Sequence, residues 1–578
     1  MTKFSTRRFD HNTVQALINR GYSEPLARAL SARGVKSPED MNYDLHNMLA
    51  PDQLLNCEAA GARLADAIQA QKKIMIIGDY DCDGATSVSL ARLGLRALGA
   101  KNVDYLIPDR EKDGYGLSTP LVKRAAERKP DLIITVDNGI SSYDAVEYAK
   151  SLGIDVIVTD HHLPGSRVPD TLIVNPNQHG DTFPSKSLAG VGVMFYVLLA
   201  TRAELRKRNA FAGGKQPNLL NFIDLVSLGT VADVVPLDRN NRILVSKGLE
   251  RMREGRMQPG ISALLTKSRK NTLFLNASDL GFLIGPRINA AGRLDSIELG
   301  VECLCTSDYG HALDIADQLE SFNKKRRSIE DDMQAEALIE TQTIAVGETN
   351  SIAIKGDNWH SGVVGIVASR IKEKTYRPTI AFAPSEENGV QYLKGSGRSI
   401  PGIHLRDVLD LVDKRNPGMI VKFGGHAMAA GLTIHADKFE LFKEAFEAAI
   451  TDTAQPGAFE KNVLTDGELS AGDFNAELVR EIRSNVWGQG FTEPLFANHF
   501  RVLSQKILKD QHLKLVLETD GRTLNAIWFR RRREIPENVH LAYKLDLNEW
   551  AGRTSVQLIV ESMEDQAQRA ILIKKSNR

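Results

Sequence analysis

The sequence predicts an α/β protein: a doubly wound parallel-sheet domain, a long connecting helix, a second smaller α/β domain and a C-terminal OB-like β-barrel. Three observations carry this prediction. Apolar runs alternate with helical patterns between about 72 and 210, a stretch from Ala312 to about Ala345 lacks Gly and Pro, and five short β-like runs lie between 460 and 570. At 578 residues the chain is also too long for one core.

The first α/β domain is predicted from short β-branched runs, which are typical of buried parallel strands. The expected strands are 73–77, 103–107, 132–136 and 154–158, and the expected helices are 85–98, 119–128, 143–151, 191–208 and 218–228. We expect a helical lead-in over 1–70, this domain over 71–305, the connecting helix over 306–347, the second α/β domain over 348–455 and the barrel over 456–578.

In the second α/β domain, a strand at Ser351–Lys355 and a helix at Val363–Lys372 are followed by KGSGRS (394–399), which we expect to form a turn, and by GGHAMAAG (424–431). The five strands expected in the barrel are 500–503, 513–517, 525–529, 540–545 and 555–559.

Composition excludes some classes of protein. Hydrophobic residues make up 42% of the chain, yet no apolar run reaches the ~18 residues of a membrane span. The first residues lack the apolar core of a signal peptide. Four cysteines without zinc-ligand spacing indicate reduced thiols, and hence a cytoplasmic protein. The lack of a long apolar run predicts that the chain has no membrane partner. Lys plus Arg equals Asp plus Glu, so net charge does not indicate a nucleic-acid partner, although a local basic patch would be hidden by that sum.

Acidic and histidine residues stand where four apolar runs end. They are Asp79, Asp81 and Asp83 in DYDCDG, Asp137 in DNG, Asp160, His161 and His162 in DHH, and Asp233 after the last helix. Ligands bind at the carboxyl ends of the strands in open α/β sheets, so these side chains should meet at one edge. Mixed carboxylates and imidazoles favour Mn²⁺ or Mg²⁺, and converging carboxylates require cations, which two metal ions about 3.5–4 Å apart would supply.

Two alternatives apply to DYDCDG. As a calcium loop starting at Asp79, it should carry a Glu at position twelve, where this chain has Leu90. One of its acids could instead cap the following helix, although three acids exceed what one cap needs.

These motifs, in this order and spacing, resemble the DHH phosphoesterase superfamily, and the second α/β domain resembles the associated DHHA1 domain. Longer segments are similar to the RecJ family of single-strand-specific 5′→3′ DNA exonucleases: DREKDGYGLS (109–118), LAGVGV (188–193), GTVADVVPL (229–237) and GPRINAAGRL (285–294). The resemblance covers about 70 to 570. It implies hydrolysis of single-stranded DNA from a 5′ end to nucleoside 5′-monophosphates by two metal ions, in recombination, repair and mismatch repair.

The resemblance also implies roles for individual residues. Asp81 and Asp83 would bind metal, Asp137 would bridge two ions, His161 would be a ligand, His162 would face the scissile phosphate and Asp233 would complete the second ion's ligands. Asp79 is a further candidate ligand. Asp160 could bind metal, but equally could hold an imidazole in its tautomer.

Other residues are candidates for contact with DNA. Arg398 and Ser396 in KGSGRS, with His426 in GGH, could bind a phosphate, whereas the alternative for such a glycine-rich segment is a tight bend. Arg110 could hold the 5′-terminal phosphate. Arg287 and Arg293 could contact the DNA backbone or form structural ion pairs. Trp528 and Phe529, followed by four arginines, could stack on bases or belong to a core.

The favoured hypothesis is a metal-dependent exonuclease acting on single-stranded DNA, with a single-strand-binding protein and a helicase as partners implied by resemblance alone, and with a monomer favoured. A small phosphodiesterase acting on dinucleotides is the second hypothesis, but the barrel argues for longer strands. A non-catalytic DNA-binding scaffold is the third, and it should lack the metal-binding acids that this chain retains.

Overall fold

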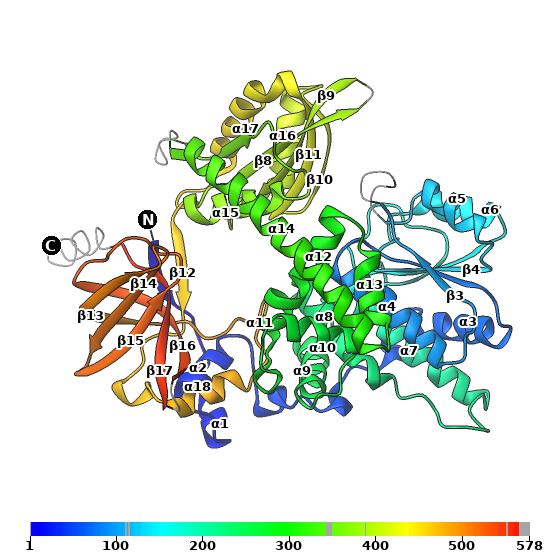
Figure 1. Ribbon diagram of the computed structural model, residues 1–578, viewed down its shortest axis with the longest axis horizontal. Helices are drawn as coiled ribbons and strands as arrows, with labels where there is room; N and C mark the ends of the chain where they lie inside the picture. Colours follow the sequence, from blue (N-terminus) through cyan, green and yellow to red (C-terminus); the bar gives the residue numbers. More distant parts are fainter. Residues whose placement is uncertain are drawn as a thin grey trace. The chain divides into compact units, whose positions relative to one another are not determined.

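The computed structural model describes residues 2–109, 113, 116–342, 349–387, 389–550 and 553–565 (Figure 1). The chain divides into two compact units. One comprises Arg8–Asn323 and Asn475–Pro494, and the other comprises Met1–Arg7, Lys324–Phe474 and Leu495–Arg578. No helix in the described part of the chain is both long and apolar enough to cross a membrane.

The first unit contains a five-stranded parallel sheet in the order β3-β2-β4-β5-β6. Its strands are β2 (Ile74–Ile77), β3 (Val103–Leu106), β4 (Leu132–Val136), β5 (Asp155–Thr159) and β6 (Leu172–Val174). The predicted doubly wound parallel sheet is therefore confirmed. The first four of these strands lie where the apolar runs predicted them.

Helices cover both faces of this sheet, as Figure 1 shows. Helices α5 (Thr119–Glu127) and α6 (Tyr143–Ser151) pack on one face, against alternate strand residues such as Met75, Ile77 and Ile133. The other face carries α3 (Cys57–Gln69), α4 (Cys82–Ala97) and α7 (Gly190–Lys207). Burial on both faces explains why the strands are continuous apolar runs, and each fully buried Ile contributes roughly 1.5–3 kcal/mol.

The rest of the first unit is helical. It contains α1 (His11–Asn19), α2 (Glu24–Ser31), α8 (Ile223–Ala232), α9 (Arg239–Arg253), α10 (Pro259–Lys267), α11 (Ala277–Asp279), α12 (Gly285–Leu294), α13 (Glu298–Cys305) and α18 (Ala476–Arg483). Helix α8 is nearly all buried and ends at Asp233. The 34-residue helix α14 (Tyr309–Gln342) begins among residues of the first unit and ends among residues of the second.

The second α/β domain is a mixed sheet in the order β10-β11-β9-β8-β7. Its strands are β7 (Ile352–Lys355), β8 (Thr379–Glu387), β9 (Val390–Arg398), β10 (Ile420–Gly425) and β11 (Ala429–His435). Helix α15 (Val364–Thr375) packs in one apolar cluster of this domain, and α16 (Leu405–Arg415) and α17 (Phe439–Thr453) pack in another.

The prediction that KGSGRS forms a turn is wrong, because residues 394–398 belong to strand β9. Its glycines are required by close packing. A Cβ on Gly395 would lie 2.5 Å from Phe382 Cε1, and a Cβ on Gly397 would lie 2.6 Å from Leu405 Cδ2. Glycine inside a strand marks such close approaches as well as bends.

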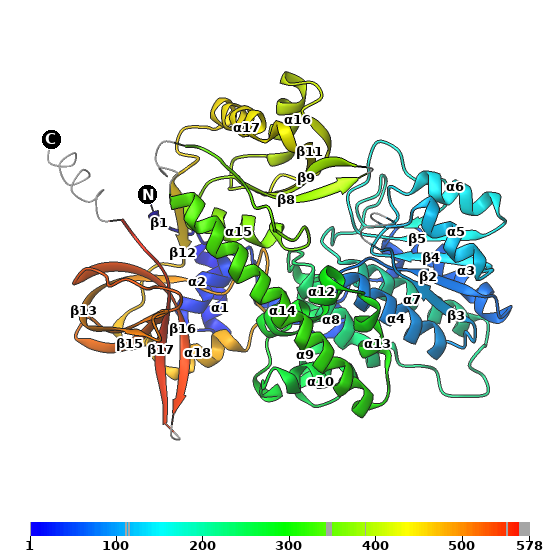
Figure 2. The ribbon, with the colours of Figure 1, turned by 45° about the horizontal axis from the view of Figure 1, so that its top comes forward.

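The C-terminal strands close into a barrel in the order β13-β14-β15-β17-β16 (Figure 2). They are β13 (Phe496–Leu508), β14 (His512–Thr519), β15 (Arg522–Trp528), β16 (Asn538–Trp550) and β17 (Arg553–Met563), which confirms all five predicted strands. The sequence did not predict β1 (Thr2–Thr6), which pairs in parallel with β12 (Lys461–Thr465) across more than 450 residues.

Candidate metal centre

The acidic and histidine residues gather at the carboxyl edge of the parallel sheet. Strands β2 and β4 are neighbours, and the chain runs from β2 to β3 on one side of this pair and from β4 to β5 on the other. Asp79–Asp83 follow β2, Asp137 follows β4, and Asp160–His162 follow β5. Such a switch point opens a crevice in doubly wound sheets, and Asp233 reaches it from the end of α8.

Asp81 takes the capping role that the sequence left open for one acid of DYDCDG. It is the N-cap of α4, and its Oδ1 accepts a hydrogen bond from Gly84 N at 3.0 Å. Helix α12 also holds this loop, because Cys82 N donates to Oδ1 of Asn289 on that helix at 2.7 Å. Capping does not remove Asp81 from the site, since one of its oxygens lies within 4.8 Å of ligand atoms of Asp79 and Asp137.

Asp83 is buried against the N-terminus of α7. Its Oδ2 accepts from Gly190 N at 2.6 Å and its Oδ1 from Val191 N at 3.1 Å, where the helix dipole favours an anion. Burial nevertheless raises the pKa of Asp83 well above its usual value, and the neighbouring Asp233 and Asp81 raise it further. The backbone alone therefore does not offset the negative charge at this position.

Two glycines make room for the carboxylates. A Cβ on Gly190 would lie 2.5 Å from Asp137 Cβ, and a Cβ on Gly229 would lie 2.7 Å from Asp83 Oδ1. This close approach explains why LAGVGV and GTVADVV carry glycine at these two positions within buried helices. Neither glycine was identified as a site residue from the sequence.

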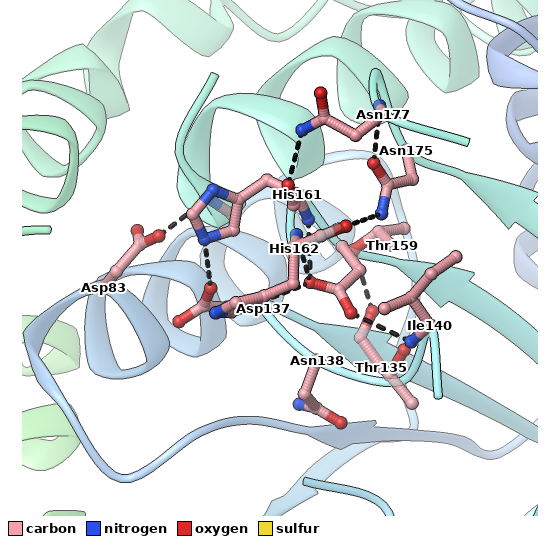
Figure 3. Close-up of polar contacts among 12 residues, drawn as sticks. Asp83, Thr135, Asp137, Asn138, Ile140, Thr159, His161, His162, Asn175 and Asn177 are labelled. Atoms are coloured by element: carbon pink, nitrogen blue, oxygen red, sulfur yellow. Dashed lines mark hydrogen bonds and ion pairs between the residues drawn. The ribbon is translucent and has the colours of Figure 1, made fainter. Parts of the chain in front are cut away.

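Asp137 and His161 face each other in the centre of the cluster (Figure 3). Asp137 is buried and has a left-handed backbone with φ 63°, which costs a non-glycine residue roughly 1 kcal/mol or more. His161 Nε2 lies 3.1 Å from Asp137 Oδ1 and 3.6 Å from Asp233 Oδ2. Asp137 Oδ1 and His161 Nε2 are both buried, and neither makes a hydrogen bond within the described residues.

The two histidines have opposite charge states. Burial, together with repulsion from His162, lowers the pKa of His161 to about 4, so its imidazole is neutral at pH 7 and can be a metal ligand. Burial also acts to lower the pKa of His162, but the hydrogen bond and charge of Asp160 outweigh it and raise that pKa to about 9. His162 is therefore a cation at the rim of the site.

Asp160 organises the two histidines. Its Oδ1 accepts from His161 N, from His162 N and, at 2.7 Å, from His162 Nδ1, while its Oδ2 accepts from Ile140 N at 2.9 Å. Both oxygens of Asp160 are engaged by protein donors. Of the two roles considered for Asp160, metal binding and holding an imidazole in its tautomer, the structure favours the second. Burial acts to raise the pKa of Asp160, but these hydrogen bonds and charges lower it overall.

The remaining donors form overlapping sets that fit divalent cations. Each set has ligand atoms within 4.8 Å of one another: Asp79, Asp81 and Asp137; Asp83, His161 and Asp233; and Asp137, His161 and His162. Asp137 and His161 each belong to two of these sets. Burial raises the pKa of Asp137 well above its usual value and that of Asp233 to about 7, and neighbouring acids add to both shifts. Hard oxygens, one neutral imidazole and uncompensated negative charge suit Mn²⁺ or Mg²⁺.

Three asparagines that were not identified from the sequence hold the loops of the site (Figure 3). Asn175 Nδ2 donates to the carbonyl of His162 at 2.9 Å, and Asn177 Nδ2 donates to that of His161 at 2.6 Å. Asn138 Nδ2 donates to the carbonyls of Ile77 and Val136, linking the ends of β2 and β4. The only sequence signal is their position directly after strands.

The predicted phosphate-binding residues of the second α/β domain lie on or beside its sheet. Arg398 is half-buried, and its Nη1 donates to Ser396 Oγ at 3.1 Å and to Gly397 O at 2.8 Å. Burial lowers the pKa of Arg398. His426 is exposed where β10 turns into β11, and its backbone N–H donates to Ala429 O.

Of the other predicted DNA contacts, Arg287 is better described by the structural alternative. It is buried, and its Nε pairs with Glu320 Oε2 of α14 at 2.7 Å. Arg293 is half-buried on α12. Arg110 lies outside the described residues. Trp528 is half-buried beneath Arg531, whose Cζ is 4.7 Å from the ring centroid, and Phe529 is 51% exposed, so Phe529 is not a core residue.

Family models match three parts of the chain: the DHH family, N-terminal domain (residues 73–230), the DHHA1 domain (345–452) and the RecJ OB domain (465–562). The single-stranded-DNA-specific exonuclease RecJ of Escherichia coli is 48% identical over 554 residues, covering 93% of this chain and 96% of that protein. The chain belongs to the RecJ family. RecJ of Bacillus subtilis is 33% identical over 97% of this chain and 70% of its own length.

Solved RecJ structures share the fold. Thermus thermophilus RecJ in complex with Mn²⁺ matches 98% of this chain and 79% of that chain, with a TM-score of 0.81 and 28% identity. The complex of the same protein with Mg²⁺ matches with a TM-score of 0.76. These two ions are the ones that the donor set of this chain favours.

Proposed function

We propose that this RecJ-family chain is a metal-dependent exonuclease that degrades single-stranded DNA. The observation that carries the proposal is the buried, mutually repelling set of Asp83, Asp137 and Asp233 around a neutral His161. Without bound cations this arrangement would lower the stability of the fold, because like charges in a buried site oppose folding. Family membership supports the activity and the substrate.

The metal ions would be held by Asp79, Asp81, Asp83, Asp137, His161 and Asp233. When bound, two divalent cations lower the pKa of a water nucleophile and neutralise charge on the phosphate. The remaining requirements fall on the protein. The backbone N–H groups of Gly190 and Val191 fix Asp83, and the Asp137 carboxylate lies 3.1 Å from His161 Nε2.

His162 is proposed to contact the scissile phosphate. Its ring lies 4.4 Å from that of His161, centroid to centroid, and Nδ1 is engaged by Asp160. A carboxylate can only accept, so Nδ1 carries a proton, and at neutral pH Nε2 carries one as well. A cation held in this way can donate a charge-assisted hydrogen bond to a phosphate oxygen.

Further DNA contacts are proposed in each domain. Arg398 and Ser396 supply side-chain donors from β9, and His426 is exposed where β10 turns into β11, the strand that pairs with β9. Arg293 remains a proposal for the DNA backbone, and Arg110 remains a proposal for the 5′-terminal phosphate. Phe529, with Trp528 and the arginines that follow, would give the barrel a stacking surface for single strands.

Finer features of the activity are also proposed. They are 5′→3′ polarity, release of nucleoside 5′-monophosphates, and action as a monomer in recombination and repair beside a single-strand-binding protein and a helicase. A cytoplasmic location is supported by four cysteines without disulfides, three of them buried.

The test compares a single-stranded oligonucleotide with its blunt-ended duplex, each incubated with the metal-stripped protein and then with Mn²⁺ or Mg²⁺. The expected result is degradation of the single strand that starts only when metal is added, with the duplex left largely intact. Equal digestion of both substrates would contradict the proposed specificity, and digestion in the presence of chelator would contradict the proposed metal dependence.

A further inference from the structure

A second group of potential metal ligands lies on the C-terminal barrel, apart from the catalytic cluster. His499 on β13 and His540 on β16 are direct partners in the antiparallel register of these strands. Directly opposed residues project from the same face of a sheet, and the two imidazoles stack with centroids 4.1 Å apart and planes at 25°.

Glu468 completes this group from the segment between β12 and β13. One ligand atom from each of Glu468, His499 and His540 lies within 4.8 Å of the others. The backbone on both sides of Glu468 is fixed to the start of β13. Gly467 O accepts from Ala497 N at 3.0 Å, and Leu469 exchanges two hydrogen bonds with the buried side chain of Asn498.

Glu564 orients one of the imidazoles. His540 Nδ1 lies 2.7 Å from Glu564 Oε2, and Phe4 N donates to Glu564 Oε1 at 3.0 Å. Because a carboxylate only accepts, Nδ1 of His540 carries a proton, which leaves Nε2 as the ring atom that can bind a metal ion. A carboxylate that fixes a histidine tautomer in this way accompanies most metal-binding histidines.

We propose that Glu468, His499 and His540 form a second divalent-metal site, which takes an ion of the zinc class. Two imidazoles and one carboxylate match the ligands of Zn²⁺ and of the late first-row metals, whereas Mn²⁺ and Mg²⁺ prefer oxygen-rich sites such as the catalytic cluster. With three protein ligands, the fourth position of a four-coordinate zinc ion would be taken by water. Glu564 is a positioning residue that acts through His540.

An ion at this site would fasten three segments of the C-terminal unit. It would join the β12–β13 connection, which carries Glu468, to the β13–β16 ladder. Through His540 and Glu564 it would also be linked to β1, which is further tied down by Thr2 N donating to Asp565. Because the ion binds only the folded barrel, it should raise the unfolding temperature of the protein.

The competing explanation is a stacked histidine pair held by carboxylates without any metal. The test uses the full-length protein, stripped with chelator, loaded with Zn²⁺ and desalted, with bound zinc counted by atomic absorption. The variants are His499→Gln and His540→Gln. The matched control is His512→Gln, a histidine of the same barrel outside the group. Both the catalytic cluster and this site can bind zinc, so the decisive quantity is the difference between variants in the number of zinc ions bound per chain.

The expected result is one zinc ion fewer per chain in His499→Gln and in His540→Gln than in the unmodified protein and in His512→Gln. Glu564→Gln should keep the stoichiometry but weaken zinc binding at this site roughly 10–100-fold. Zinc should also raise the melting temperature less in the two ligand variants than in the control. Equal zinc content in all four proteins would overturn the proposal, and unchanged affinity in Glu564→Gln would overturn the positioning role.

Discussion

His161 Nε2 lies 3.1 Å from Asp137 Oδ1, and both atoms are buried without a hydrogen bond in the described part of the chain. Buried polar atoms are satisfied in most folded proteins, since leaving one unpaired costs about 1–3 kcal/mol. A cation that binds both atoms would remove this cost. A bound cation therefore accounts for the position of His161 better than a direct ion pair with Asp137 does. The pKa of His161 is lowered to about 4, so its imidazole is neutral at pH 7 and cannot form that ion pair.

Replacing a ligand should abolish turnover without preventing folding. Asp81→Ala and His161→Ala should each lower the rate on single-stranded DNA by roughly 10³-fold, since metal-ion catalysis contributes several kcal/mol. Binding of the single strand, measured by fluorescence anisotropy, should change little. Loss of binding together with turnover would point instead to misfolding or to metal-dependent binding.

Asp160→Asn should alter the pH profile of the reaction. The hydrogen bond and charge of Asp160 oppose the effect of burial and keep the pKa of His162 raised, at about 9. Without that charge, His162 should lose its proton at a lower pH, and the alkaline limb of the rate profile should move in the same direction. His162→Ala provides the control, because it should lack this limb. An unchanged profile in Asp160→Asn would mean that His162 does not act as a cation.

The stability of the metal-free protein should fall as pH rises. Burial, together with Asp81, raises the pKa of Asp233 to about 7 from an unfolded value near 4. The contribution of Asp233 to the free energy of unfolding is therefore fully present below about pH 4 and is lost as pH rises through about 7. Melting temperatures measured between pH 5 and 8 with chelator should fall less steeply in Asp233→Asn, and saturating Mn²⁺ should weaken the decline in the unmodified protein.

An exposed carboxylate gives the control for this experiment. Asp170→Asn removes one charge from an almost fully exposed side chain, which pairs with Lys150 and belongs to none of the groups of potential metal ligands among the described residues. Its pH dependence should match that of the unmodified protein. If Asp170→Asn and Asp233→Asn flatten the curve equally, the effect reflects net charge and Asp233 has no special part in it.

Gly229→Ala should be strongly destabilising, because its Cβ would lie 2.7 Å from Asp83 Oδ1 inside a packed helix. Overpacking of this kind costs typically 1–3 kcal/mol and here would also displace a metal-binding carboxylate. Chemical denaturation and Mn²⁺ titration would measure both effects. Gly213→Ala is the matched control, since its Cβ would meet no atom within 4 Å.

The positions of the candidate ligand residues could be predicted because local patterns determine them. Short apolar runs fix the strands, and parallel strands bring Asp81, Asp137 and His161 to one edge whatever the rest of the chain does. The five barrel strands were found for the same reason. Residue spacing also made one acid of DYDCDG a plausible helix cap, and the structure places Asp81 in that role.

The supporting residues could not be predicted because their partners are distant in sequence. Asn289 reaches Cys82 across 207 positions, and β1 pairs with β12 across more than 450. The glycines of KGSGRS indicated a turn, yet in a strand they serve packing against Phe382 and Leu405, which no local pattern reveals. Likewise, the ion pair of Arg287 depends on where α14 passes.

One measurement tests the central claim most directly: digestion of a single-stranded oligonucleotide, labelled in separate samples at its 5′ or 3′ end, by the metal-stripped protein with and without Mn²⁺. We predict metal-dependent release of a mononucleotide from the 5′ label, while the 3′-labelled strand shortens progressively. No cleavage with any divalent metal would contradict the account and favour a DNA-binding scaffold. Cleavage confined to the shortest fragments would favour a small phosphodiesterase instead.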